Sequence, residues 1–147
     1  MKIRYATISD LAQVSQLFDA YRVFYEKESD IKSAQNFIAQ RINKNESTII
    51  VAEGEDGMLI GFTQLYPIFS STRMKKLWLL NDLFVHPNFR GLNISNALIN
   101  EAKNLSKNTL AAGLILETAK TNTIGNLLYP KCGFELDNEH NFYSWNG

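Results

Sequence analysis

The sequence has little of what marks several common protein classes. Cys132 is its single cysteine, so no disulfide can form within the chain, and a reducing compartment is expected. The two histidines and this cysteine show no metal-ligand spacing, so no metal site is predicted. Basic and acidic residues number 15 each, so the chain lacks the basic surplus of a general nucleic-acid binder. No apolar run is long enough to cross a membrane, and no signal peptide is evident. These absences predict a cytoplasmic protein without nucleic-acid or membrane partners.

The order of apolar patterns predicts a mixed α/β protein. The 147 residues suit one domain, expected over residues 1–147. Alternation and β-branched runs predict strands over residues 2–6, 47–52, 58–69, 77–85, 112–118, 134–136 and 141–145. Spacings of three and four predict helices over residues 11–25, from Asp30, from Ile94 and from Thr121 or Asn122, the last with Ile124, Leu127 and Leu128 facing inward. A strand–helix–strand crossover over residues 77–118 should make its two strands parallel.

Residues 81–103 organise the rest of the chain. The apolar strand LWLLNDLFV runs into the polar elbow HPNFRGLN, and an amphipathic helix follows. Pro87 ends the strand, and Gly91 permits a tight turn with positive φ. A helix then begins, its first backbone N–H groups lack partners within the helix, and Arg90 lies beside them. Free donors, the positive end of a helix dipole and a cation together predict a site that holds phosphate oxygens.

Two further motifs stand after the elbow, and together the three carry a resemblance. They read RGLNIS, LETAKTN and LLYPKCGFE. The chain resembles the GCN5-related N-acetyltransferases (GNAT), whose turn has the pattern Arg or Gln, Gly, any residue, Gly, an aliphatic residue, then Gly or Ala. Asn93 and Ser95 depart from that pattern, and Gly125 replaces a usual alanine. Because asparagine tolerates positive φ better than other non-glycine residues, Asn93 can keep the turn. Both departures are expected to retune cofactor affinity.

The resemblance implies a fold and a cofactor. The fold is an α/β (α+β) acyl-CoA N-acyltransferase fold with a mixed, mostly antiparallel, V-shaped sheet of about seven strands flanked by four helices. The cofactor is acetyl-CoA, used as co-substrate, with its pantetheine arm along one strand and its pyrophosphate on the elbow. The implied cofactor-binding residues are Leu83, Phe84, Val85, Phe89, Arg90, Gly91, Leu92, Asn93, Ile94, Ser95, Asn122 and Tyr129. The Val85 N–H is expected to face the developing oxyanion.

Three residues are the candidates for proton transfer. Tyr129 matches the tyrosine that acts as general acid in the family, and the ordinary pKa values of phenol and thiol suit that transfer. Glu117 and Asp82 are alternative general bases, acting directly or through water, because burial raises the pKa of a carboxylate. A chain of water molecules without a single base remains the other alternative.

The segment that joins the first two helices is expected to line the acceptor pocket. The predicted substrate-binding residues are Tyr21, Arg22, Tyr25, Glu26, Asp82 and Glu117. Three acids in this segment suit an ammonium-bearing substrate such as a polyamine or a lysine side chain, and tyrosines add cation–π contact. Arg22 instead suits a carboxylate, as an amino acid would carry. Tyr66, Phe69 and Trp78 are further candidates for the pocket wall.

The sequence therefore predicts an N-acetyltransferase that acts on the primary amine of a small molecule by direct attack in a ternary complex. The alternatives are a protein N-terminal or lysine acetyltransferase and a non-catalytic acyl-CoA-binding module, the latter suggested by Asn93 and Ser95. A homodimer is a further expectation.

Overall fold

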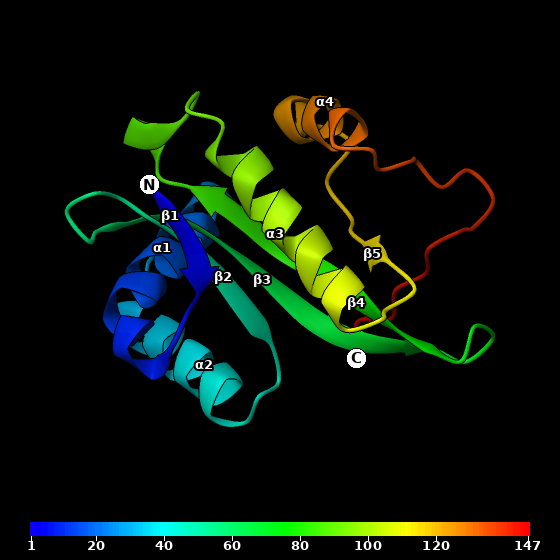
Figure 1. Cartoon of the computed structure of the whole chain (residues 1–147), viewed down its shortest axis with the longest axis horizontal. Coiled ribbons are helices and arrows are strands. Elements are labelled where there is room, and N and C mark those ends of the chain that lie inside the picture. The colour runs from blue at the N-terminus through cyan, green and yellow to red at the C-terminus, as the bar shows by residue number, and fades with distance from the viewer. The chain divides into compact units, whose positions relative to one another are not determined.

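One five-stranded sheet runs through the computed structural model, which describes residues 1–147 (Figure 1). The strands lie in the order β1-β2-β3-β4-β5. The first three pairs, β1–β2, β2–β3 and β3–β4, are antiparallel, and the last pair, β4–β5, is parallel. Their bounds are β1 Lys2–Tyr5, β2 Thr48–Glu53, β3 Leu59–Ser70, β4 Lys75–Val85 and β5 Leu114–Ile115. The predicted mixed α/β fold and the parallel crossover are confirmed, with five strands instead of about seven.

The chain forms four α-helices, as predicted. They are α1 Leu11–Phe24, α2 Ile31–Asn43, α3 Ile94–Asn108 and α4 Thr123–Lys131, and short 3-10 turns occupy Ile8–Asp10 and Pro87–Phe89. Asp30 caps α2, as predicted, because its side chain accepts a hydrogen bond from the Ser33 N–H at 3.0 Å. Asn122 caps α4 by accepting from the Gly125 N–H at 3.1 Å.

The sheet is covered on both faces by helices of the first unit. Phe62 and Phe84 belong to a core cluster with Val14, Leu17 and Phe18 of α1. The neighbouring Gly61 points to the other face, where a Cβ would lie 3.4 Å from Ile94 Cγ2 of α3. Successive residues of a strand face opposite sides, so α1 with α2 covers one face and α3 the other (Figure 1). The absent side chain at Gly61 lets the start of α3 approach the sheet closely.

The chain divides into two compact units, Met1–Leu116 and Glu117–Gly147. The single domain expected over residues 1–147 stays a prediction. The first unit contains the whole sheet and α1–α3, whereas the second contains α4 and the chain that follows it. None of the helices is both long enough and apolar enough to span a bilayer.

The predictions for the last quarter of the chain are wrong in three respects. The strand expected over residues 112–118 is limited to Leu114–Ile115. The closing strands expected over residues 134–136 and 141–145 do not form, and Trp145 is 90% exposed. Ile124 and Leu127 of α4, expected to face inward, are exposed. A segment of this length buries too little apolar surface to form its own core, and an alternating pattern makes a strand only where a partner strand is present.

Candidate functional site

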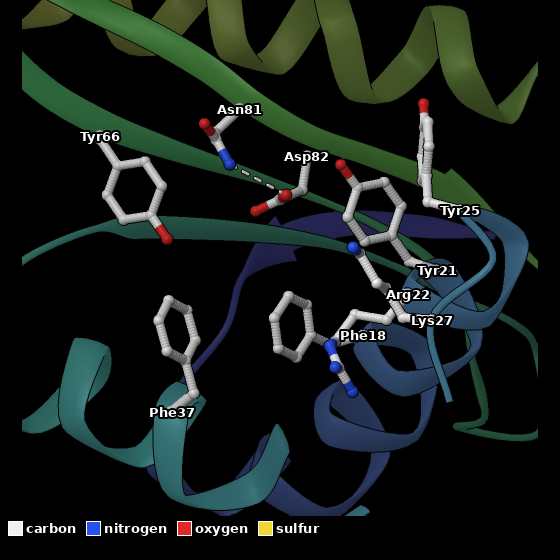
Figure 2. Close-up of a pocket in the computed structure, with 9 residues that line it drawn as sticks. All are labelled: Phe18, Tyr21, Arg22, Tyr25, Lys27, Phe37, Tyr66, Asn81 and Asp82. Atoms are coloured by element: carbon white, nitrogen blue, oxygen red, sulfur yellow. Dashed lines mark hydrogen bonds between the residues drawn. The ribbon is translucent and has the colours of Figure 1, made fainter. Parts of the chain in front are cut away.

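A pocket of about 290 Å³ opens on the face of the sheet covered by α1 and α2 (Figure 2). In Figure 2, Tyr66 of β3 and Asn81 and Asp82 of β4 lie on the sheet side, and Phe37 of α2 lies across from them. The remaining lining residues come from α1 and the segment after it. Together the lining residues are Phe18, Tyr21, Arg22, Tyr25, Lys27, Phe37, Tyr66, Asn81 and Asp82.

A β-bulge at Asn81 explains how two adjacent residues of one strand both line the pocket. The register passes from Gln64 opposite Asp82 to Leu65 opposite Leu80, which leaves Asn81 without a partner in β3. In a regular strand, neighbouring side chains point to opposite faces, and one extra residue alters that alternation. Asn81 and Asp82 therefore reach the same cavity, and the Asn81 Nδ2 donates to Asp82 Oδ1 at 3.0 Å.

The Asp82 carboxylate is buried, with only 4% of the residue exposed. Gln64 Nε2 donates to Asp82 Oδ2 at 2.8 Å, and Ser47 Oγ donates to Gln64 Oε1 at 2.8 Å. Burial raises the pKa of Asp82 above its ordinary value, while hydrogen bonds from Gln64, Tyr21 and Asn81 act in the opposite direction. A buried carboxyl with a raised pKa, facing a cavity, is suited to accept a proton.

Aromatic rings form most of the pocket wall. Tyr21 packs edge-on against Tyr25 with 5.0 Å between ring centroids, and Phe18 stacks on Phe37 at 5.4 Å. Burial, with the negative charge of Asp82 as the second cause, raises the pKa of Tyr66 to about 12. Tyr66 therefore keeps its phenolic proton at neutral pH and offers the pocket a hydrogen-bond donor.

The structure brings part of the predicted acceptor segment to this pocket. Tyr21, Arg22 and Tyr25 line it, whereas Glu26 does not. Glu26 has a left-handed φ of 61°, and the turn closes with the Lys27 N–H donating to the Arg22 carbonyl at 3.0 Å. This turn brings the next residue, Lys27, to the pocket instead.

Several lining residues were not expected as site residues. Sequence reasoning did not name Phe18, Lys27, Phe37 or Asn81 as site residues. Of the three candidate wall aromatics, Tyr66 lines the pocket. Phe69 is 76% exposed, and buried Trp78 donates from Nε1 to Thr109 Oγ1 at 2.9 Å. For Lys27 and Asn81 the only sequence signal was their closeness to residues that were predicted.

The second half of β4 has a neighbouring strand on one edge only. Pairing with β5 covers Trp78 and Leu79 and then stops. At the other end of β4, the His86 N–H donates to the Ile60 carbonyl at 2.9 Å. Hydrogen bonding alternates between the edges of an antiparallel strand, so the N–H groups of Leu83 and Val85 point away from β3, toward the open edge. The predicted pantetheine strand thus presents donors along a free edge.

The elbow after β4 has the geometry that its sequence predicts. Gly91 and Asn93 both have positive φ, 80° and 62°, and Asn93 lies at the N-cap of α3. The first hydrogen bond of α3 runs from the Ala97 N–H to the Asn93 carbonyl at 3.2 Å. The N–H groups that precede Ala97 therefore lie before the helical ladder, where they are able to bind an anion. The expectation that Asn93 preserves the turn agrees with this conformation.

Arg90 connects the elbow to the strand and to α1. Its Nε donates to the Val85 carbonyl at 3.2 Å. The guanidinium carbon lies 5.4 Å from the Phe24 ring centroid and 5.8 Å from that of Phe84. Both contacts stabilise one orientation of the side chain, and the terminal nitrogens of the fork carry further donors.

The remaining candidates lie in the second unit. Tyr129 is in α4, where its ring packs edge-on against Phe134 at 5.8 Å, and its carbonyl accepts from the Phe134 N–H at 3.0 Å. Asn122 is the N-cap of α4, and its Nδ2 donates to Thr118 Oγ1 at 2.9 Å. Glu117 is exposed and lies outside β5, not at the end of a buried strand as predicted.

The site contains no cluster of metal-ligating side chains. No three His, Cys, Asp or Glu residues lie close enough together to hold a metal ion. The two features that stand out in the first unit are therefore the aromatic pocket with its buried carboxylate and the open edge of β4 that leads into the elbow. Asp82 and Leu83, which are adjacent in β4, connect the two features directly.

Comparison with known proteins shows which proteins the whole chain is similar to. Residues 14–134 match the acetyltransferase (GNAT) family. The chain is 43% identical over 137 residues, 93% of this chain and 91% of the relative, to the "Uncharacterized N-acetyltransferase YhfO" of Bacillus subtilis. It is 32% identical over 120 residues to a "Probable acetyltransferase" of Haemophilus influenzae, with 82% of each chain covered. A crystal structure of "a probable acetyltransferase" matches with a TM-score of 0.95 at 33% identity, covering 99% of this chain and 97% of that one.

Proposed function

Because the chain belongs to the GNAT family of acetyltransferases, we propose that it transfers the acetyl group of acetyl-CoA to the primary amine of a small molecule by direct attack. The observation that carries this proposal is the juxtaposition within β4 of a buried pocket carboxylate, Asp82, with the free N–H groups of Leu83 and Val85. The carboxylate suits an amine, and the N–H groups suit an extended, amide-containing arm that lies along the strand edge.

The residues of the first unit fit the predicted cofactor. The donors of Leu83 and Val85 would hold the amide groups of the pantetheine arm in the manner of an added strand. The backbone N–H groups of Gly91, Leu92, Asn93, Ile94 and Ser95, at the positive end of α3, would hold the pyrophosphate. Phe89 lies in the 3-10 turn that leads into this segment. Acetyl-CoA would supply an acetyl group already activated as a thioester.

Arg90 supports this cofactor site in two ways. Its Nε anchors the Val85 carbonyl and so orients the peptide groups at the end of the strand. Its terminal nitrogens remain as donors for a phosphate group. We assign the Val85 N–H to the oxygen of the acetyl carbonyl, on which negative charge develops during attack.

We assign Asp82 to the acceptor amine. The amine nitrogen forms a bond to the acetyl carbonyl carbon while the carbon–sulfur bond breaks, and the nitrogen gives up one proton. Asp82 accepts that proton directly or through one water molecule, and its burial raises its basicity. Tyr21 and Asn81 hydrogen-bond to the carboxylate and keep it oriented toward the pocket.

The roles of the second unit stay proposals from the family motif. Tyr129 is assigned to give a proton to the departing thiolate, which balances the proton taken from the amine. Asn122 is assigned to the cofactor, in addition to its observed role as a helix cap. Glu117 stays an alternative base, although it is exposed and not buried as expected.

The proposal is tested in two steps on the full chain. Calorimetry should detect binding of acetyl-CoA, and release of free thiol should then depend on an added amine. The amine panel should include small molecules, a peptide with a free N-terminus and a lysine-containing peptide with that terminus blocked. Turnover only with peptides would favour protein acetylation. Binding without any turnover would favour a non-catalytic acyl-CoA module, and absence of binding would overturn the proposal.

A further inference from the structure

The charges around the pocket differ from those that the sequence suggests. The acceptor segment contains three acids, Glu26, Glu28 and Asp30, and none of them lines the cavity. Asp30 caps α2 through Ser33. The charged residues that do line the cavity are Arg22, Lys27 and Asp82. A pocket for a polyamine was expected to be acidic, whereas this one has two cations and a single carboxylate.

The conformation of the acceptor segment is fixed by Asp19, which is itself buried. Ser29 Oγ donates to Asp19 Oδ2 at 2.6 Å, and the Asp30 N–H donates to Asp19 Oδ1 at 2.8 Å. These bonds hold the segment back toward α1 and complement the turn at Glu26. Lys27 therefore reaches the pocket because the backbone is held, and its place there does not depend on a flexible loop.

The two cations, Arg22 and Lys27, differ in whether a nearby acid already balances their charge. Arg22 Nη1 lies 3.6 Å from Asp19 Oδ1 and donates to the Glu28 carbonyl at 3.3 Å. Lys27 forms no ion pair and is exposed at the pocket rim, while Asp82 lies buried on the sheet side. The cavity thus has an acid at its inner end, aromatic walls, and a free ammonium group at its rim.

This arrangement discriminates between classes of amine. An acceptor with a second ammonium group would place it beside Lys27, where like charges repel each other. An acceptor with an anionic group would instead gain an attractive partner there. Arg22 adds positive potential of the same sign, although Asp19 partly offsets it. The aromatic walls favour an apolar body between the two charged ends.

We propose that the acceptor is a small primary amine that carries a carboxylate on an apolar body, with the amine at Asp82 and the carboxylate at Lys27. This inference rests on the proposed acetyl transfer, since it names the substrate class of that same pocket. It favours an amino-acid-like acceptor over a polyamine.

The test compares amines in pairs that differ in the carboxylate. Phenylalanine is compared with phenethylamine, 5-aminopentanoate with pentylamine, and lysine with cadaverine, with kcat/KM measured for each by thiol release. The two spacings of amine and carboxylate sample different distances across the pocket. We expect at least one carboxylated member to exceed its partner about fivefold or more, the scale of an exposed ion pair. Equal or faster turnover of pentylamine, phenethylamine and cadaverine would overturn the inference and leave acetyl transfer intact.

A charge-removing variant with a matched control locates the effect. Lys27→Gln should lower kcat/KM for the preferred carboxylated amine about fivefold, mainly through KM, and so remove most of its advantage over the partner that lacks the carboxylate. Lys44→Gln removes an exposed lysine just after α2 that does not line the pocket, and it should change neither. A Lys27→Gln enzyme that keeps the full carboxylate preference would overturn the inference. Failure of every amine in every protein would count against the proposed function itself.

Discussion

Asn81 and Asp82 are neighbours in β4, yet both side chains face one pocket, and Asn81 Nδ2 lies 3.0 Å from Asp82 Oδ1. The bulge that makes this possible lies at the point where the strand stops pairing with β5 and begins to expose its free edge. The same irregularity thus brings a carboxylate to the acceptor pocket one residue before the strand edge that is proposed to hold the cofactor.

Replacing Asp82 with asparagine should lower kcat by about 10²-fold or more, because general-base catalysis contributes on that scale. The wild-type rate should rise with pH as the carboxyl ionises, and the raised pKa of Asp82 places this rise above the ordinary range of an aspartate. The pH profile of kcat/KM should lose that limb in Asp82→Asn. Thermal unfolding of both proteins shows whether the variant remains folded.

Glu117→Gln is the matched control for the base, because it makes the same change at an exposed position. We expect its pH profile to resemble that of the wild type. Loss of the limb in Glu117→Gln, with Asp82→Asn unaffected, would transfer the role to Glu117. Intact profiles in both variants would favour a chain of water molecules.

Tyr129→Phe should lower kcat by about 10²-fold while the affinity for CoA changes little, because only the hydroxyl is removed. The edge-on contact of the ring with Phe134 does not need that hydroxyl, so α4 should stay folded. Single-turnover thiol release and calorimetry with CoA measure the two quantities separately. Tyr143→Phe, at an exposed position of the C-terminal segment, is the control. An unchanged kcat in Tyr129→Phe would remove the residue from its proposed role.

Much of the fold follows from the sequence because each long element has its own periodicity. The amphipathic patterns of α1–α3 and the β-branched or apolar runs of β2–β4 each determine a local structure. The turn at α3 was also predictable, since asparagine is the non-glycine residue that best adopts the positive φ found at Asn93. The sequence after residue 133 has similar alternation, but it forms no strand, because strand formation depends on a pairing partner that local pattern does not supply.

The chemistry of the site was more predictable from the sequence than the set of residues that line it. Asp82 was a candidate base because a carboxylate buried in a strand has a raised pKa, and the structure places it in the pocket. The bulge at Asn81 leaves no mark in the run LWLLNDLFV, because one extra residue alters pairing without altering composition. In the acceptor segment, the positive φ of Glu26 decides that Lys27 lines the pocket, and a glutamate gives little signal for that conformation.

Stability should fall in acid through the contact between Asp10 and Arg4. Arg4 Nη2 lies 2.8 Å from Asp10 Oδ1, and this hydrogen bond is the main cause that lowers the pKa of Asp10 from 3.8 to about 2. A carboxyl with a lowered pKa contributes stability above its unfolded pKa and loses it as pH falls through the folded one. We therefore expect a loss of about 1 kcal/mol between pH 5 and pH 2 from this pair, after allowance for solvent screening.

Urea unfolding across that pH range measures the loss. Asp10→Asn should unfold more easily at pH 7 and show a flatter dependence on pH than the wild type. Asp56→Asn, an exposed position without an ion pair, should keep the wild-type slope. An Asp10→Asn protein whose stability still falls as steeply would assign the acid loss to other carboxylates.

The affinity for CoA should depend on the backbone conformation at residue 93 more than on the asparagine side chain. Asn93→Ala keeps a Cβ at a φ of 62° without the local hydrogen bonding that helps asparagine there, so it should weaken CoA binding by about 1 kcal/mol, or about fivefold. Asn93→Gly removes the steric cost and opens the approach to the backbone donors, so binding should be as tight as in the wild type or tighter. Calorimetry with CoA compares these variants with Asn100→Ala, an exposed position in the same helix that should bind as the wild type does. Tenfold weaker binding in Asn93→Gly would instead show that the amide side chain itself contacts the cofactor. The turn would then bind CoA through a side chain as well as through its backbone N–H groups.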